Sequence, residues 1–323
     1  MKCPTCSKQH KVKEGMKCLC GYEFVFNPKE DGISDGQFLA VVRGASSNGE
    51  YYFTMNQFHA EHRRRSTGSP LKPAIISAVT LGLGIGLYAM ASDFFGILLI
   101  IVGVIAAISA LVKWGAAPKT FNTWQKLTER WRQAKGAAGL EKLIAGPTLH
   151  KPPPDWQEQD IYDYGFERLL IVERDELVDL FVLNKLHAEQ RTLIFSESGY
   201  PLYLLPPAQK TLDANPTLPV FLLHNASPSG EQMKDRIENW SHLNLAGHPI
   251  TDLGLCMTDI ARMKGMKKIK ADQDQGGTAV DLLKYATLAG GLGLALDQQI
   301  SLGGLLLNEN APNDGGASGG NFG

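Results

Sequence analysis

Four of the five cysteines lie within the first 20 residues, and this spacing constrains the fold of the N-terminus more than any other feature. They form two close pairs, Cys3 with Cys6 and Cys18 with Cys20. Residues 1–17 are polar and lysine-rich and lack the apolar core of a secretory signal, so we expect reduced thiols. Each short Cys-turn-Cys pair can supply two ligands to a tetrahedral ion. The spacing therefore predicts a structural metal site with four cysteine ligands.

The two cysteine pairs resemble a zinc ribbon, expected over residues 1–27. This resemblance implies a structural Zn²⁺ with a closed coordination shell, which contributes roughly 10–16 kcal/mol to the folding of such small units. The second pair departs from the usual spacing, because one residue rather than two separates its cysteines. Unligated thiols or a disulfide are the alternative interpretation, and His10 is an outside substitute ligand.

Residues 28–70 are expected to form a helical connector. Ser34 or Asp35 can cap a helix over residues 36–43, and a second helix is expected over residues 51–65. His59 and His62 lie one helical turn apart in that second helix. Since no third ligand is placed near them, we interpret them as surface histidines.

Two uncharged runs, residues 74–91 and 94–112, predict a transmembrane helical hairpin over residues 71–113. As helices they would extend about 27 and about 28 Å, close to the roughly 30 Å thickness of the hydrocarbon core. Basic residues flank the pair and none lies in its turn, so the positive-inside rule places both termini in the cytoplasm. The prediction is a multi-pass protein of the inner or plasma membrane. A buried hairpin within a soluble domain is the alternative.

The remainder of the chain divides into three segments. Residues 114–154 predict a helical connector followed by a Pro-rich spacer. Residues 155–272 predict an α/β domain, because short apolar runs expected to be parallel strands alternate with helical patterns. Those strands are expected at residues 168–172, 192–195, 218–223 and 250–255. Residues 273–323 are expected to form a glycine-rich, partly disordered tail, although the apolar stretch 286–307 leaves membrane contact open.

Functional residues in a parallel sheet gather at the carboxyl ends of its strands. The loops there resemble a Toprim domain, in the version found in the topoisomerase VI A subunit family. The resemblance covers about 100 of 323 residues and depends on the order of the segments Ile171–Asp175, Gly199–Pro201, Asn225–Gly230 and Leu253–Asp259. It implies a magnesium site made by a glutamate, at the position of Glu173, and by an Asp-x-Asp motif after the third strand.

The two aspartate positions of that motif hold Asn225 and Ser227. Their neutral oxygens remove two formal negative charges from a site where Mg²⁺ needs carboxylates, so we expect little Mg²⁺ binding and no catalysis. The segment from Ser227 through Ser229 to Gly230 precedes a helix and can either cap it or hold an anion on free amides. Glu173 can equally serve only as a hydrogen-bond acceptor at the start of a helix.

The chain carries 32 Lys and Arg against 33 Asp and Glu, a net charge of −1, which excludes a protein that coats nucleic acid through bulk charge. The combined prediction is a membrane-anchored, cytosol-facing accessory or scaffold protein. Its zinc ribbon and non-catalytic Toprim-like domain would bind a protein or nucleic-acid partner. The alternative is a divergent metal-dependent enzyme that cleaves phosphodiesters, centred on Glu173.

Overall fold

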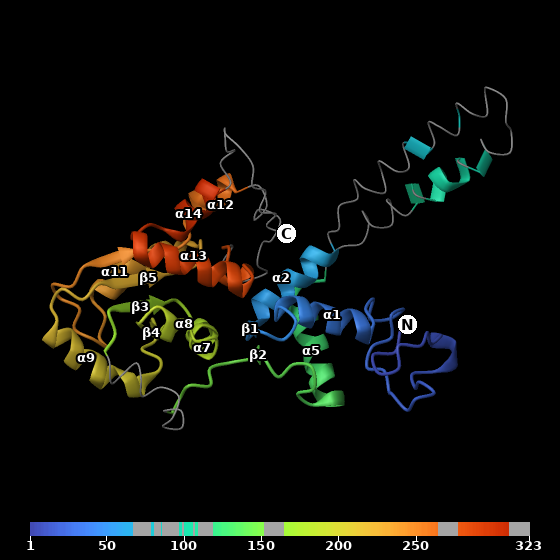
Figure 1. Cartoon of the computed structure of the whole chain (residues 1–323), viewed down its shortest axis with the longest axis horizontal. Helices are drawn as coiled ribbons and strands as arrows, with labels where there is room; N and C mark the ends of the chain where they lie inside the picture. The colour runs from blue at the N-terminus through green and yellow to red at the C-terminus, as the bar shows by residue number, and fades with distance from the viewer. Residues whose placement is uncertain are drawn as a thin grey trace. The chain divides into compact units, whose positions relative to one another are not determined.

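The computed structural model describes residues 1–66, 79–80, 85, 97–98, 100–105, 107–108, 119–151, 165–263 and 277–309 (Figure 1). The chain divides into two compact units. Residues 1–61 and 121–322 make up the first unit, and residues 62–120 with Gly323 make up the second. The predicted spacer at 152–154, the start of the tail before residue 277 and its end from residue 310 lie outside the described residues.

No helix in the described part of the chain is both long and apolar enough to cross a lipid bilayer. This finding contradicts the prediction of a two-span membrane protein, and with it the predicted membrane localisation and orientation. Most of the two expected spans, residues 74–91 and 94–112, lies outside the described residues. The prediction depended on two runs without charge, and an uncharged run alone does not establish a continuous membrane-spanning helix.

A four-stranded parallel sheet forms the centre of the first unit, with strand order β4-β3-β5-β6. Its strands are β3 (Arg168–Val172), β4 (Thr192–Ser196), β5 (Val220–Leu223) and β6 (Ile250–Asp252). In register, Val172 of β3 lies beside Ser196 of β4 and Leu223 of β5. The sequence analysis predicted these strands and their parallel direction, and both predictions are confirmed.

The apolar side chains of β3 alternate between two cores, as the two-residue period of a strand requires. Leu170 and Val172 face one core, whereas Leu169 and Ile171 face the other. The first core is covered by α7 (Asp175–Leu183), α8 (Leu186–Glu189), α13 (Tyr285–Gln298) and α14 (Leu302–Glu309), and the second by α9 (Leu205–Ala214) and α11 (Met233–Glu238). This region also contains η2 (Leu202–Leu204), α10 (Pro228–Glu231) and α12 (Met257–Arg262).

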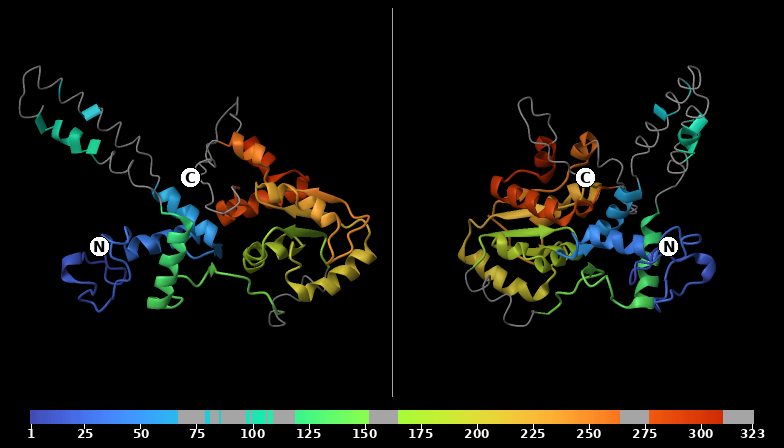
Figure 2. Two further views of the ribbon diagram at one scale, coloured as in Figure 1. Left: turned by 180° about the vertical axis from the view of Figure 1, so that it is seen from behind. Right: turned by 45° about the vertical axis from the view of Figure 1, so that its right-hand side comes forward.

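Residues expected to belong to the glycine-rich tail complete the first of these cores. They form η4 (Val280–Leu282), α13 (Tyr285–Gln298) and α14 (Leu302–Glu309). Leu288, Leu292 and Leu296 of α13 are buried in the same cluster as Leu170. Figure 2 shows α13 and α14 in red beside the sheet from two directions. This part of the predicted tail is therefore structured and belongs to the α/β core.

The residues before and after the second unit form a small aromatic core. Its elements are α1 (Asp35–Ala45), β1 (Phe53–Thr54), α2 (Met55–Ser66), α5 (Phe121–Lys135) and β2 (Leu143–Ile144), and the short helix η1 (Val12–Glu14) precedes them without a buried residue. Ser34 caps α1 through a bond from Gln37 N, as its sequence predicted. Phe38 lies at the centre, with ring centroids of Phe58 and Trp131 at 5.3 and 4.9 Å. The strands β1 and β2 pair in parallel.

Asp281 connects this aromatic core to the α/β region. Its carboxylate is fully buried and accepts hydrogen bonds from Thr54 Oγ1 (2.6 Å), Asn56 Nδ2 (3.0 Å) and Arg174 Nη2 (2.6 Å). A buried carboxylate is tolerated only when paired and hydrogen-bonded. Two of these donors come from the junction of β1 and α2 and the third from the loop after β3, so one side chain connects its own segment to two others.

We predict that Asp281→Ala lowers the free energy of unfolding by about 3–5 kcal/mol, because it leaves Arg174 and two buried donors without their acceptor. Urea denaturation of the full chain measures the change. Asp297→Ala is the matched control, since Asp297 also pairs with an arginine (Arg168, 2.9 Å) but is 62% exposed. The control should cost less than about 1 kcal/mol. Equal losses in both variants would contradict the role given to Asp281.

Candidate metal centre and the carboxyl edge of the sheet

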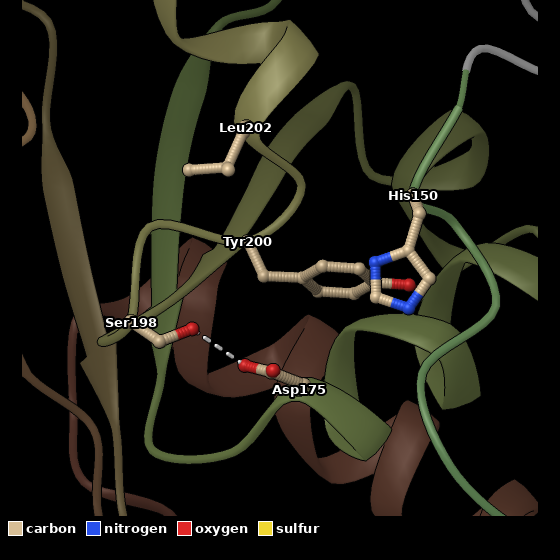
Figure 3. A pocket seen from close by; sticks show the side chains of 5 residues that line it. All are labelled: His150, Asp175, Ser198, Tyr200 and Leu202. Carbon is tan, nitrogen blue, oxygen red and sulfur yellow. Dashed lines mark hydrogen bonds between the residues drawn. The ribbon is translucent and has the colours of Figure 1, made fainter.

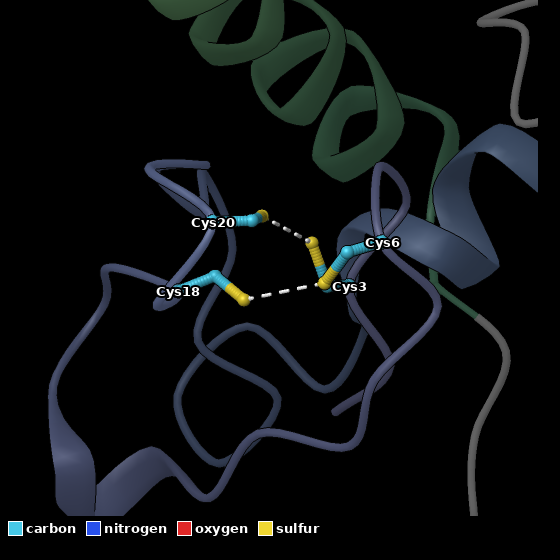
Figure 4. A group of neighbouring side chains, drawn as sticks. All are labelled: Cys3, Cys6, Cys18 and Cys20. Carbon is cyan, nitrogen blue, oxygen red and sulfur yellow. Dashed lines mark hydrogen bonds between the residues drawn. The ribbon is translucent and has the colours of Figure 1, made fainter.

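The four N-terminal cysteines converge on one point (Figure 4). The Sγ atoms of Cys3 and Cys20 are 3.6 Å apart, as are those of Cys6 and Cys18, and all four lie within 4.8 Å of one another. Within the described residues, this is the only group of three or more His, Cys, Asp or Glu side chains arranged to share a metal ion. The cluster could hold a metal ion, as the cysteine spacing predicted.

Backbone turns bring each cysteine pair into this arrangement. In the first, Ser7 N donates to Cys3 O (3.0 Å), and in the second Gly21 N donates to Cys18 O (2.9 Å). Gly21 has a φ of +89°, a conformation that favours glycine. His10 is not part of the cluster, because its Nε2 bonds Gly15 O at 2.8 Å and its ring stacks on another aromatic side chain. Four sulfurs alone therefore define the centre.

The thiols influence one another's protonation. Burial opposes ionisation of Cys3, but hydrogen bonds with the backbone of Cys6 and Thr5 outweigh it and lower its pKa to about 7. Cys20 has a bond with the Tyr22 backbone that favours the thiolate, yet burial and the three neighbouring thiols raise its pKa to about 12. Four thiolates repel one another at this distance. A bound cation removes that repulsion, so it would stabilise the fully deprotonated set.

Asp35 attaches the cysteine-bearing segment to α1. Its fully buried carboxylate accepts hydrogen bonds from Tyr22 OH (2.7 Å) and from the backbone amides of Val25 (3.0 Å) and Phe26 (2.9 Å).

His59 is buried against Phe121, and the centroids of the two rings are 5.6 Å apart. The interpretation of His59 as a surface histidine is therefore wrong.

The parallel sheet brings the predicted site residues of β3 and β5 to one edge. Glu173 directly follows β3, and its Oε2 accepts a hydrogen bond from Asn225 N at 2.8 Å. The loop containing Ser198 and Tyr200 follows β4, the neighbour of β3 on the other side. The three loops singled out by sequence therefore lie along the same edge.

The side-chain oxygens of Asn225 and Ser227 accept hydrogen bonds from within the chain. Asn225 Oδ1 accepts from Val280 N (2.9 Å), and Ser227 Oγ accepts from Gly230 N (2.9 Å). Ser229 contributes its carbonyl, which accepts from Arg236 Nη1 (2.8 Å). A Cβ on Gly230 would meet Asn225 O at 2.2 Å, so this turn requires glycine. Ser227 is thus the cap of a four-residue helix, α10.

His224 is a titratable group in contact with this turn, and it is 1% exposed. Its Nδ1 lies 2.8 Å from Asn225 O and its Nε2 3.0 Å from Asp252 Oδ1. Both partners are acceptors, and only the protonated ring has a donor on each nitrogen to satisfy both. Burial opposes this charge, but the bonds to Asp252 and Asn225 and the charges of Asp252 and Glu173 raise the pKa of His224 above its usual value. This edge of the sheet therefore favours the protonated form of His224.

The pairing of His224 with Asp252 was not predicted from the sequence. The strand expected at residues 250–255 ends at Asp252 in the structure, and this places Asp252 at the carboxyl edge of the sheet, where functional residues gather. Two further pairings were missed. Arg236 pairs with Glu197 through two hydrogen bonds, one of them 2.9 Å long, and Ser198 Oγ donates to Asp175 Oδ1 at 2.8 Å.

No protein-family model, curated protein or solved structure matches the chain. Function is therefore inferred from the geometry of its own residues.

We predict that the purified chain carries about one equivalent of transition metal, as expected for one four-sulfur site. Cys18→Ser should lose it, because three thiolates and a hydroxyl no longer complete the set. Elemental analysis of the gel-filtered protein measures the content. Cys256→Ser is the control, since Cys256 is outside the cluster and should leave the metal content unchanged. Metal retained in full by Cys18→Ser would contradict the assignment.

A second prediction concerns pH. Because the folded-state pKa of His224 is raised, its contribution to stability is complete below its unfolded pKa of about 6.5. It is lost as the pH rises through the folded value. The difference in unfolding free energy between wild type and His224→Gln should therefore shrink as the pH rises from about 6.5 through the raised folded-state pKa of His224. Urea denaturation measures this difference, and NMR of the His224 ring in wild type follows its proton directly. A difference that stays constant or widens as the pH rises contradicts the prediction.

Proposed function

We propose that the chain is a zinc-stabilised recognition protein whose α/β domain is a non-catalytic relative of the Toprim domain. The observation that carries this proposal is the internal use of Glu173, Asn225 and Ser227. Each of these residues stands at the position of a metal ligand in the Toprim family, and each accepts a hydrogen bond from within the chain: Glu173 from Asn225 N, Asn225 from Val280 N and Ser227 from Gly230 N.

Zinc is the ion that fits the four-sulfur centre best. Tetrahedral Zn²⁺ with Zn–S bonds of about 2.3 Å places its sulfurs roughly 3.8 Å apart. The sulfur pairs of Cys3 with Cys20 and of Cys6 with Cys18 are 3.6 Å apart. Because four protein ligands close the shell, the ion would hold the N-terminal segment together and would leave no position for a substrate.

The Toprim likeness is supported by the placement of three loops. Glu173, the Tyr200 loop and Asn225 follow β3, β4 and β5, which pair in parallel around β3. This matches the order and the common edge that the resemblance implies. The departure at Asn225 and Ser227 argues against catalysis, since Mg²⁺ binds protein through carboxylates. In the described residues, Glu173 belongs to no cluster of three possible metal ligands.

Charge at this edge favours a protein partner over nucleic acid. The cations near Glu173 are already engaged, since Arg174 binds Asp281 and Arg236 binds Glu197. The carboxylate of Asp175, which lies beside the Tyr200 loop, has no ion pair among the described residues. A phosphate backbone would meet repulsion here. A partner surface carrying positive charge would be attracted.

The test is a titration of the zinc-loaded full chain with Mg²⁺ and with Mn²⁺, followed by calorimetry and by Mn²⁺ electron paramagnetic resonance. We expect no saturable binding below millimolar concentration and no difference between wild type and Glu173→Gln. Asn225→Asp combined with Ser227→Asp should create binding, because it restores the two missing carboxylates. Tight Mg²⁺ binding by wild type that Glu173→Gln abolishes would overturn the proposal and favour a phosphodiester-cleaving enzyme.

A further inference from the structure

A small hollow opens beside the sheet edge, lined by His150, Asp175, Ser198, Tyr200 and Leu202 (Figure 3). We propose that it receives one basic side chain, a guanidinium or an ammonium group, from a protein partner. This inference rests on the proposed recognition function and names the chemistry that the partner presents.

The size of the hollow suits a single side chain. It encloses about 220 Å³, below the roughly 300–1,000 Å³ of pockets that hold whole small molecules. Three parts of the chain form it: the segment after β2, the N-terminus of α7 and the loop after β4. Its location at the carboxyl edge of the sheet is where ligands of such folds bind.

Asp175 gives the hollow its charge. Its Oδ1 accepts hydrogen bonds from Ser196 Oγ (2.5 Å) and Ser198 Oγ (2.8 Å). In the part of the chain that the structure describes, no cation pairs with this carboxylate and no hydrogen bond reaches its Oδ2. The two hydroxyls hold the carboxylate in place, and Oδ2 remains for a ligand. A cationic donor is the chemistry that a fixed, half-buried carboxylate binds.

The aromatic and apolar walls suit the rest of a basic side chain. Tyr200 is 5% exposed and its hydroxyl is held by Asp179 Oδ1 (2.6 Å) and by the backbone amide of Leu149. His150 meets the Tyr200 ring at 5.3 Å, nearly edge-on. Ring faces attract cations. Leu202 is 65% exposed at the rim, where it can cover the aliphatic stem of a Lys or Arg.

The hollow is preorganised, which lowers the entropic cost of binding. Asp179 is fully buried and bonds Thr148 N (2.7 Å) as well as Tyr200. It therefore fixes the segment that carries His150 against the loop that carries Tyr200. An anion is excluded as the occupant, because Asp175 would repel it.

The experiment is an NMR titration of the ¹⁵N-labelled full chain with N-acetyl-arginine N-methylamide. N-acetyl-citrulline N-methylamide is the matched probe, since it has the same shape and no charge. We expect saturable shifts at Ser198 and Leu202 with the arginine probe and at least tenfold weaker binding of the citrulline probe. Asp175→Asn should weaken the arginine probe at least tenfold.

Glu176→Gln is the control variant, because it removes one charge from the adjacent position of the same helix terminus without lining the hollow. It should stay within twofold of wild type. Leu202→Ala should weaken both probes by a similar factor, and this variant tests the hollow even if Asp175→Asn fails to fold. Absent binding, equal binding of the two probes, or equal effects of Asp175→Asn and Glu176→Gln would overturn the inference. None of these results involves Mg²⁺ binding at Glu173, so the failure of the proposed function is measured separately.

Discussion

The parallel pairing of β3 with β4 on one side and β5 on the other is the constraint on which the candidate site depends. It places Glu173 and Asn225, 52 residues apart in sequence, within one hydrogen bond of each other. The same pairing brings Ser198, from the loop after β4, to Asp175 at the start of α7. The hydrogen-bonded edge at Glu173 and Asn225 and the adjacent hollow at Asp175 both exist because β3, β4 and β5 end at the same edge of the sheet.

Three buried aspartates connect segments that secondary structure alone leaves separate. Asp35, Asp179 and Asp281 are each 0% exposed, and each accepts at least three hydrogen bonds. Of the three, only Asp281 has an arginine partner among the described residues. Because unpaired burial of a carboxylate costs several kcal/mol, these donors must be in place when the chain folds. The carboxylates therefore favour one arrangement of the cysteine segment, the linker before the sheet and the aromatic core.

Sequence alone predicted the elements that carry a local signal. The strands β3, β4 and β5 are short apolar runs between polar loops, and the cysteine spacing identified the metal centre. The helix α13 was not predicted from the sequence, because its alternating glycines and leucines give little helical periodicity. These residues become buried only against the sheet. The sequence did not identify Asp281 either, since its donors lie more than 100 residues away. The membrane prediction was wrong because it relied on uncharged length alone.

Hydrogen bonds within the chain hold this edge of the sheet together around Asn225. The Asn225 side chain accepts a hydrogen bond from Val280 N, and its backbone amide donates to Glu173 Oε2. His224 lies between Asn225 O and Asp252, and the Asp252 carboxylate favours its protonated form. The carboxylates of Glu173 and Asp252 are thus each engaged by a partner within the chain, Asn225 N and His224, whereas Oδ2 of Asp175 accepts no hydrogen bond among the described residues. An external cation is therefore attracted to the hollow, where a carboxylate oxygen is not engaged.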